Sequence, residues 1–185
     1  APQPSQVERV HELGIEVPSL EDMEEIEISN RLYREANADY MTVILPGQSP
    51  DKVQVSGPVT FILSPQRMVT VRHHAPRPFE TFPERADRSS TGCASPQHLF
   101  AGLIEEIVSR QADLLESVGK VLDKLTGRIY GGNAVNDGGF LQGALETLGR
   151  ESEAVGRVRL ALLSVERAVS YFSLGSDVPG LGQGA

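Results

Sequence analysis

Two long apolar repeats in the second half of the chain constrain its fold more than any other feature. In the first, apolar residues recur at alternating spacings of three and four from Ile104 to Leu125, with Gln111 as the one polar member. In the second, four apolar residues lie seven apart, at Leu148, Val155, Leu162 and Val169, and they interleave with Val158, Val165 and Phe172. Such spacing is typical of helices that pack along a continuous seam. We expect helices over residues 96–129 and 140–172, joined by the loop 131–139 into a long antiparallel hairpin.

The first half of the chain has the pattern of a smaller unit that mixes helices and strands. Three strands are expected, at Tyr40–Leu45, Val59–Leu63 and Arg67–Arg72, and the last two form a tight antiparallel hairpin. Pro46 is expected to end the first of them. Short helices are expected at Gln6–Leu13, after Ser19 and at Phe79–Asp87. The fold class is therefore α+β, with a mixed or antiparallel sheet beside the helical hairpin.

These elements suggest a division into three parts. Residues 1–94 would form a small head, residues 95–174 the hairpin that packs on it, and residues 175–185 a flexible, glycine-rich tail. No stretch reaches 18 consecutive apolar residues, and the first ten residues lack the layout of a signal peptide. The sequence as given therefore predicts a soluble, cytoplasmic chain, which starts and ends abruptly enough to be an excised piece.

The charge of the chain is unevenly placed. The formal net charge is −8, and residues 1–40 hold ten acidic against three basic residues, so they carry seven of the eight net negative charges. A chain of this charge is a poor candidate for binding the phosphate backbone of a nucleic acid. The single cysteine, Cys93, excludes a disulfide framework within one chain and fits a reducing compartment.

The densest group of carboxylates lies in the stretch LEDMEEIE, residues 20–27. Ser19 is the expected N-cap of a helix there, with Asp22 three residues on as a variant capping box. On such a helix Glu21, Asp22 and Glu25 would lie within one turn and repel one another, and a hard cation such as Mg²⁺ would relieve the repulsion. A solvated helix face that binds nothing explains the same pattern, and the pattern alone favours that simpler interpretation.

The sequence contains no set of residues that predicts catalysis. His73 and His74 are adjacent on an expected strand and so face opposite ways, and neither His11 nor His98 has a partner at ligand spacing. Cys93 lies in a loop with no histidine base near it in sequence. We expect no enzymatic activity, and a hydrolase that uses the acidic cluster is the weakest alternative because no general base or phosphate cradle accompanies it.

The run GIEVPSLEDMEEIEISNRLY, residues 14–33, resembles the LGI-x-(L/V)-P-x-x-E-x-M-x-E-I-E-x-S-x-R-L-Y run of CorA-type divalent-cation transporters. Residues 59–72 are similar to the strand hairpin of that family, and residues 95–129 and 141–174 to its pair of long helices. The resemblance implies a cytoplasmic α/β/α domain of a homopentameric membrane transporter, with its first strand mostly missing. The stalk helix, the membrane helices and the Gly-Met-Asn pore signature of the family are absent from this sequence.

The resemblance also implies a role for the acidic helix. In the family, the carboxylate at the position of Asp22 shares a regulatory Mg²⁺ with the stalk helix of a neighbouring protomer. Asp22 is thus the expected ligand, with Glu21 and Glu25 as weaker contributors, and Mg²⁺ binding between protomers would gate the transporter at the cytoplasmic face of the membrane. The chain alone is expected to bind Mg²⁺ weakly and to be monomeric or weakly self-associated. A zinc-transporting relative and a helical-hairpin interaction module without any ion role stay open as alternatives.

Overall fold

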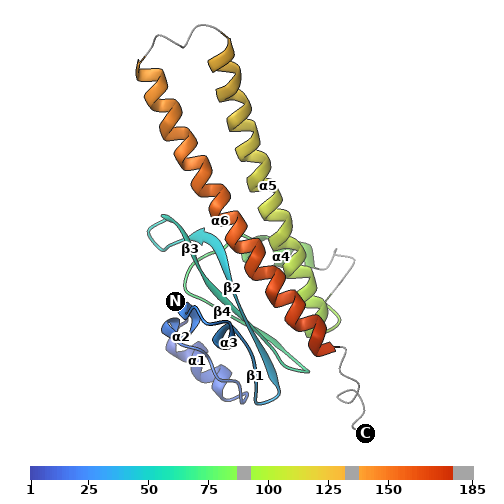
Figure 1. Cartoon of the computed structure of the whole chain (residues 1–185). Helices are drawn as coiled ribbons and strands as arrows, with labels where there is room; N and C mark the ends of the chain where they lie inside the picture. Colours follow the sequence, from blue (N-terminus) through green and yellow to red (C-terminus); the bar gives the residue numbers. More distant parts are fainter. Residues whose placement is uncertain (87–92, 132–137, 177–185) are drawn as a thin grey trace.

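The computed structural model describes residues 1–86, 93–131 and 138–176 (Figure 1). Along the chain, three short helices precede a four-stranded sheet, and a further short helix and two long ones follow it. The elements are α1 (Pro4–His11), α2 (Leu20–Glu24), α3 (Ile28–Arg31), β1 (Leu32–Glu35), β2 (Ala38–Gln48), β3 (Gln54–Leu63), β4 (Met68–Arg72), α4 (Pro78–Arg85), α5 (Pro96–Tyr130) and α6 (Gly138–Ser176).

The sheet is an antiparallel meander in the order β1-β2-β3-β4. Its register pairs Leu32 with Met41, Phe61 with Met41, and Phe61 with Thr70, so these positions form one row across the strands. The predicted hairpin of β3 and β4 is confirmed, as is the α+β class, and the sheet is antiparallel rather than mixed.

The two faces of the sheet bury different helices, because side chains alternate between the faces along each strand. On one face, Val43, Phe61 and their neighbours pack against α4, α5 and α6. On the other face, Tyr40, Ile62 and Val71 pack with Ile15 and with Met23 of α2. The head is therefore layered as helix, sheet and helix, with the long pair α5 and α6 on one side and the short N-terminal helices on the other (Figure 1).

The long hairpin is confirmed, and its tip extends well beyond the sheet (Figure 1). The predicted seam of α5 is largely right, since Ile107, Gln111, Val118 and Leu125 are buried. The predicted seam of α6 is right only in part: Leu148, Val155 and Val169 are exposed, whereas the interleaved Val158 and Val165 are buried.

Besides Val158 and Val165, the buried face of α6 carries three alanines, Ala144, Ala161 and Ala168. Small side chains let the helix backbone approach its neighbours closely, so the larger apolar residues are left on the outer face. Three of the four residues seven apart therefore lie at the surface, and the interleaved valines lie in the core.

Two strand predictions also need correction. Strand β2 does not end at Pro46 but continues to Gln48, and β1 was not predicted at all. Pro46 is tolerated because Ile44, two residues before it, directs its N–H to the hydroxyl of Ser164 on α6. Nitrogens two residues apart face the same edge of a strand, so Pro46 removes no hydrogen bond from the β2–β3 ladder.

The remaining boundaries shift by a few residues. Helix α1 spans Pro4–His11 in place of Gln6–Leu13, because Pro4 occupies its first turn and Gln3 and Gln6 form a reciprocal capping box before it. Helix α4 ends at Arg85, and Asp87 of the predicted helix lies outside the described residues. Helix α6 runs to Ser176, so the predicted tail begins inside it, and residues 177–185 lie outside the described part. The division at residue 94 stays a prediction.

Candidate functional site

The acidic stretch forms the short helix α2, and its start follows the predicted capping pattern. The Ser19 hydroxyl accepts a hydrogen bond from the Asp22 amide at 3.2 Å. In return, Asp22 Oδ2 accepts hydrogen bonds from the Ser19 amide at 2.9 Å and from the Ser19 hydroxyl at 2.6 Å. The reciprocal cap satisfies backbone donors that the first turn of a helix otherwise leaves free.

The cap also fixes the charge of Asp22. The hydrogen bonds from the Ser19 side chain and, to a smaller extent, from the Ser19 backbone lower the pKa of Asp22 from its ordinary value. Both hydrogen bonds end on Oδ2, and Oδ1 has no partner among the residues that the structure describes. Asp22 is therefore an exposed carboxylate held in one orientation, with one oxygen available to a cation.

The structure does not place Glu25 on the same helical turn as Asp22. Helix α2 ends at Glu24, and Glu25 follows in an extended conformation with ψ of 140°. Its carboxylate accepts a hydrogen bond from the Asn30 side chain, and its carbonyl accepts one from Arg31 Nε at 2.5 Å. Glu21 lies in the first turn and is exposed. Of the three carboxylates expected within one helical turn, only Glu21 and Asp22 lie in the helix. The Glu25 carboxylate bonds to Asn30 instead.

Helix α2 is anchored by one apolar side chain. Met23 is 1% exposed and packs with Tyr40 on the sheet, and the Tyr40 hydroxyl donates a hydrogen bond to the Glu16 carbonyl at 3.1 Å. Leu20 and Ile26 do not share this core: Leu20 is exposed, and Ile26, which follows the end of the helix, is 87% exposed. The result is an acidic surface with an apolar residue protruding beside it.

Tyr33 lies close enough to this surface to respond to its charge. Its ring stacks on Tyr40 with a centroid distance of 4.7 Å. Burial, followed by the nearby Tyr40, Glu35 and Asp22, raises the pKa of Tyr33 to about 12. Tyr33 therefore stays protonated at neutral pH.

The arrangement can supply one or two carboxylate oxygens to a cation but does not enclose one. Within the described ranges, no group of three or more His, Cys, Asp or Glu side chains is arranged to hold a metal ion. Mg²⁺ is commonly held by one or two carboxylates together with water. A site with that chemistry needs further oxygen ligands from another chain or from solvent.

The histidines and the cysteine do not assemble into a second site. His73 and His74 follow the end of β4 rather than lying on it. The His74 ring packs against Gly47 and Gly57, where a Cβ atom would come within 3 Å of it, and its Nε2 lies 2.9 Å from the Leu45 carbonyl oxygen. His11 Nε2 lies 3.7 Å from Glu16 Oε2. His98 Nδ1 lies 2.7 Å from the hydroxyl oxygen of Ser95, the N-cap of α5. Cys93 is exposed.

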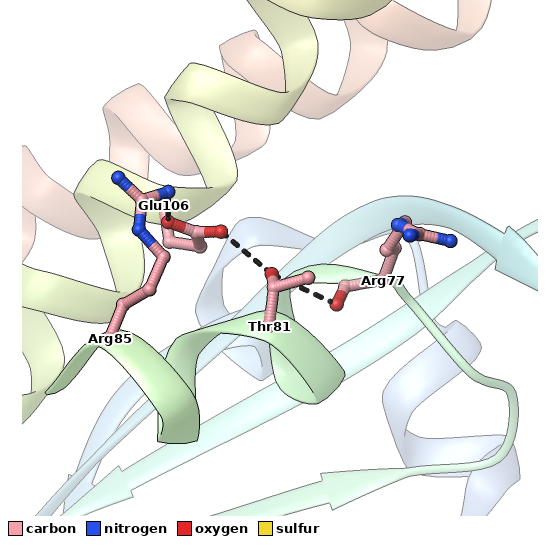
Figure 2. Close-up of polar contacts among 4 residues, drawn as sticks. All are labelled: Arg77, Thr81, Arg85 and Glu106. Atoms are coloured by element: carbon pink, nitrogen blue, oxygen red, sulfur yellow. Dashed lines mark hydrogen bonds and ion pairs between the residues drawn. The ribbon is translucent and has the colours of Figure 1, made fainter.

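One polar cluster was missed by the sequence reasoning. Glu106 on α5 accepts hydrogen bonds from the Thr81 hydroxyl at 2.6 Å and from Arg85 Nη1 at 2.7 Å, and its side chain is 13% exposed. Figure 2 shows both α4 residues directed at the carboxylate, whereas the Arg77 guanidinium points away from it. The cluster ties α4 to α5. No spacing rule signals it, because Glu106 lies 25 residues from Thr81 and 21 residues from Arg85, in a different helix.

Comparisons with known proteins place these observations in a family. The sequence model of the family described as "CorA-like Mg2+ transporter protein" matches residues 1–178. A "Magnesium transport protein CorA" of Yersinia pseudotuberculosis is 24% identical over 179 residues, which cover 96% of this chain and 56% of that protein. Proteins with the same description from Salmonella typhimurium and Escherichia coli K12 are each 24% identical over 169 residues, or 91% of this chain and 52% of theirs.

The chain thus spans about half the length of the curated relatives it matches. Across the part of the chain that the structure describes, no helix is both long and apolar enough to cross a membrane.

Proposed function

Because the chain belongs to the CorA-like Mg²⁺ transporter family, we propose that it is the regulatory domain of a magnesium transporter and that it senses Mg²⁺ between protomers. In this proposal the domain lies at the cytoplasmic face of the membrane and works within a homopentamer. The names of the matched relatives specify magnesium, which favours Mg²⁺ over the zinc alternative. The relatives are described as transport proteins, so no enzymatic step is assigned to the chain.

The observation that carries the proposal is the state of Asp22. Its carboxylate is exposed, oriented by Ser19 through Oδ2 and ionised at neutral pH, and its Oδ1 has no partner within the described residues. Glu21, in the same helical turn, adds negative charge beside it. Ile26 and Leu20 are also exposed near it.

Gating follows from the requirement for a second set of ligands. A cation shared by Asp22 and a neighbouring chain binds only in the arrangement of subunits that brings the ligands together. Binding therefore stabilises that arrangement by its differential affinity for it. Loss of the ion leaves carboxylates facing one another without a cation, which favours separation of the subunits.

The capping box dictates how the site is tested. Replacing Asp22 by Ala would remove both its charge and its hydrogen bonds to Ser19. Asp22→Asn removes the charge but keeps an oxygen that accepts the hydrogen bond from the Ser19 amide. Ser19→Ala is the matched control, because it weakens the cap and keeps the carboxylate.

The experiment on this chain is titration with Mn²⁺, a paramagnetic ion with similar ligand preferences, followed by NMR. We expect selective broadening of the amide signals of α2 at millimolar ion, its loss in Asp22→Asn, and its persistence in Ser19→Ala. Equal broadening in wild type and Asp22→Asn would show that Asp22 is not a ligand.

A further inference from the structure

The two oxygens of the Asp22 carboxylate have different surroundings. Oδ2 accepts hydrogen bonds from the Ser19 amide at 2.9 Å and from the Ser19 hydroxyl at 2.6 Å. A carboxylate oxygen offers about two acceptor positions, so both positions of Oδ2 are occupied. Oδ1 has no partner among the residues that the structure describes. One oxygen of Asp22 is therefore open to a cation, and the other is held by the helix cap.

The neighbouring carboxylates do not replace the oxygen that the cap holds. Glu21 and Glu24 lie one and two residues from Asp22 on α2, and side chains at these spacings do not face each other on a helix. Glu25 follows the end of the helix, and its carboxylate bonds to Asn30. These acidic residues add negative charge near the site. Within the described residues of one chain, the oriented and open ligand is Oδ1 of Asp22.

The orientation of this carboxylate is fixed by the start of the helix. The Ser19 hydroxyl donates to Oδ2 and at the same time accepts a hydrogen bond from the Asp22 amide at 3.2 Å. The helix itself is anchored to the sheet by Met23, which is 1% exposed. To present both oxygens to one ion, the carboxylate must give up hydrogen bonds from Ser19. Hydrogen bonds to an ionised group are stronger than neutral ones, so the arrangement with one open oxygen is favoured.

Mg²⁺ and Ca²⁺ use a carboxylate in different ways. Mg²⁺ requires a nearly octahedral set of oxygens at about 2.0–2.1 Å, keeps several of its waters and is bound through one or two carboxylates. Ca²⁺ takes about six to eight oxygens in a flexible geometry, and a carboxylate often binds it through both oxygens. A carboxylate with one open oxygen therefore satisfies Mg²⁺ and withholds a ligand from Ca²⁺.

We propose that Ser19 determines which ion binds at Asp22: by occupying Oδ2 it limits the carboxylate to coordination through one oxygen and so favours Mg²⁺ over Ca²⁺. The inference rests on the proposed function, because it concerns the ion site assigned there to Asp22. Ser19 is a positioning residue that acts through the Asp22 carboxylate. If Ser19 served only to cap α2, its hydroxyl would have no influence on the choice between the two ions.

The test measures the dissociation constants of the whole chain for Ca²⁺ and for Mg²⁺, from the NMR shifts of the α2 amide signals during titration. Ser19→Ala and Ser19→Gly both remove the hydroxyl that donates to Oδ2. Glycine is the second variant because it costs a helix cap little stability. We expect both variants to strengthen Ca²⁺ binding relative to Mg²⁺ binding several-fold. Ser19→Thr keeps a hydroxyl at this position and should retain the wild-type ratio of the two constants.

Two controls separate the choice of ion from the effects of charge and of capping. Glu21→Gln removes a negative charge beside the site and should weaken the binding of both ions by similar factors. Ser95→Ala removes the hydroxyl that caps α5 and should change neither constant. An unchanged ratio in Ser19→Ala and Ser19→Gly, with binding still lost in Asp22→Asn, would overturn this inference alone. Binding that survives in Asp22→Asn would overturn the proposed function and the inference with it.

Discussion

The hydroxyl group of Ser164 on α6 lies 2.9 Å from the amide nitrogen of Ile44 on β2, and 3.4 Å from the carbonyl oxygen of the same residue. Strand β1 pairs with β2 only from Ala38 to Met41. Between Met41 and the isolated bridge of Gln48 with Ala75, no described strand pairs with that edge of β2, and the buried serine takes the place of one. This contact joins the long hairpin to the centre of the sheet.

Replacing Ser164 by Ala should therefore lower the free energy of unfolding more than the removal of an exposed serine hydroxyl would. The Ile44 N–H would be left without a partner in a partly buried position, which costs about 1–3 kcal/mol. Urea unfolding measures the effect. Ser173→Ala, which removes an exposed hydroxyl bonded only to the Val169 carbonyl, should change stability little; equal effects of the two variants would contradict the assignment.

Glu106 should matter more to stability than the arginine that contacts it. Glu106→Gln removes the negative charge of the carboxylate that accepts hydrogen bonds from Thr81 and Arg85. We expect the free energy of unfolding to fall by about 1–2 kcal/mol. Arg85→Ala removes a partner whose side chain is 67% exposed, and a loss below about 1 kcal/mol is expected. The control is Glu116→Gln in the exposed pair with Lys120, which should leave the urea midpoint nearly unchanged. A larger loss for Arg85→Ala than for Glu106→Gln would show that α4 is not held through the carboxylate.

Gln111 is a site where a substitution should stabilise the protein. It is buried on α5, and its Oε1 has no hydrogen-bond partner among the described residues. A buried acceptor without a partner costs its desolvation energy, and Met fills a similar volume without that cost. We expect Gln111→Met to raise the free energy of unfolding by about 1 kcal/mol, and Gln142→Met, at an exposed site on α6, to give no gain. A loss of stability in Gln111→Met would indicate that the amide oxygen is bonded in solution.

His74 should make stability depend on pH in the mildly acidic range. Burial lowers the pKa of His74 from its ordinary value of 6.5, although its hydrogen bond to the Leu45 carbonyl opposes the shift. A depressed folded-state pKa means that the unfolded chain binds the proton more tightly. The contribution of His74 is therefore present above pH 6.5 and is lost as the pH falls through the folded-state pKa.

The measurement is the free energy of unfolding between pH 7.5 and about 5. Wild type should lose more stability over this range than His74→Gln. His73 also has a pKa lowered by burial, so His73→Gln is measured in parallel to separate the two contributions. An identical pH dependence in wild type and His74→Gln would rule out the role given to His74.

The sequence was sufficient to predict the elements whose signal is local and repeated. The long hairpin follows from apolar spacing over more than four turns, and the β3–β4 hairpin follows from two apolar runs around Ser64-Pro-Gln-Arg67. The capping box of Ser19 and Asp22 was also predicted correctly, because both partners lie three residues apart on one turn.

The features that were missed depend on contacts between distant segments. Pro46 is tolerated in β2 because its nitrogen faces the edge away from β3, the edge on which Ile44 bonds to Ser164, 120 residues away. The alanine face of α6 was missed because hydrophobicity gives more weight to Leu and Val than to Ala, whereas close approach to β2 requires small side chains. At the candidate site, the role of Asp22 stays a prediction, and the end of α2 at Glu24 separates Glu25 from the expected helical row.

The central claim is that Asp22 contributes to a Mg²⁺ site shared between protomers, and limited proteolysis of the transporter that contains this domain tests it most directly. Wild type, Asp22→Asn and Ser19→Ala are digested with and without Mg²⁺. We expect Mg²⁺ to protect wild type and Ser19→Ala but to give little protection to Asp22→Asn. Equal protection of wild type and Asp22→Asn by Mg²⁺ would contradict the account and leave α2 as a solvated acidic surface.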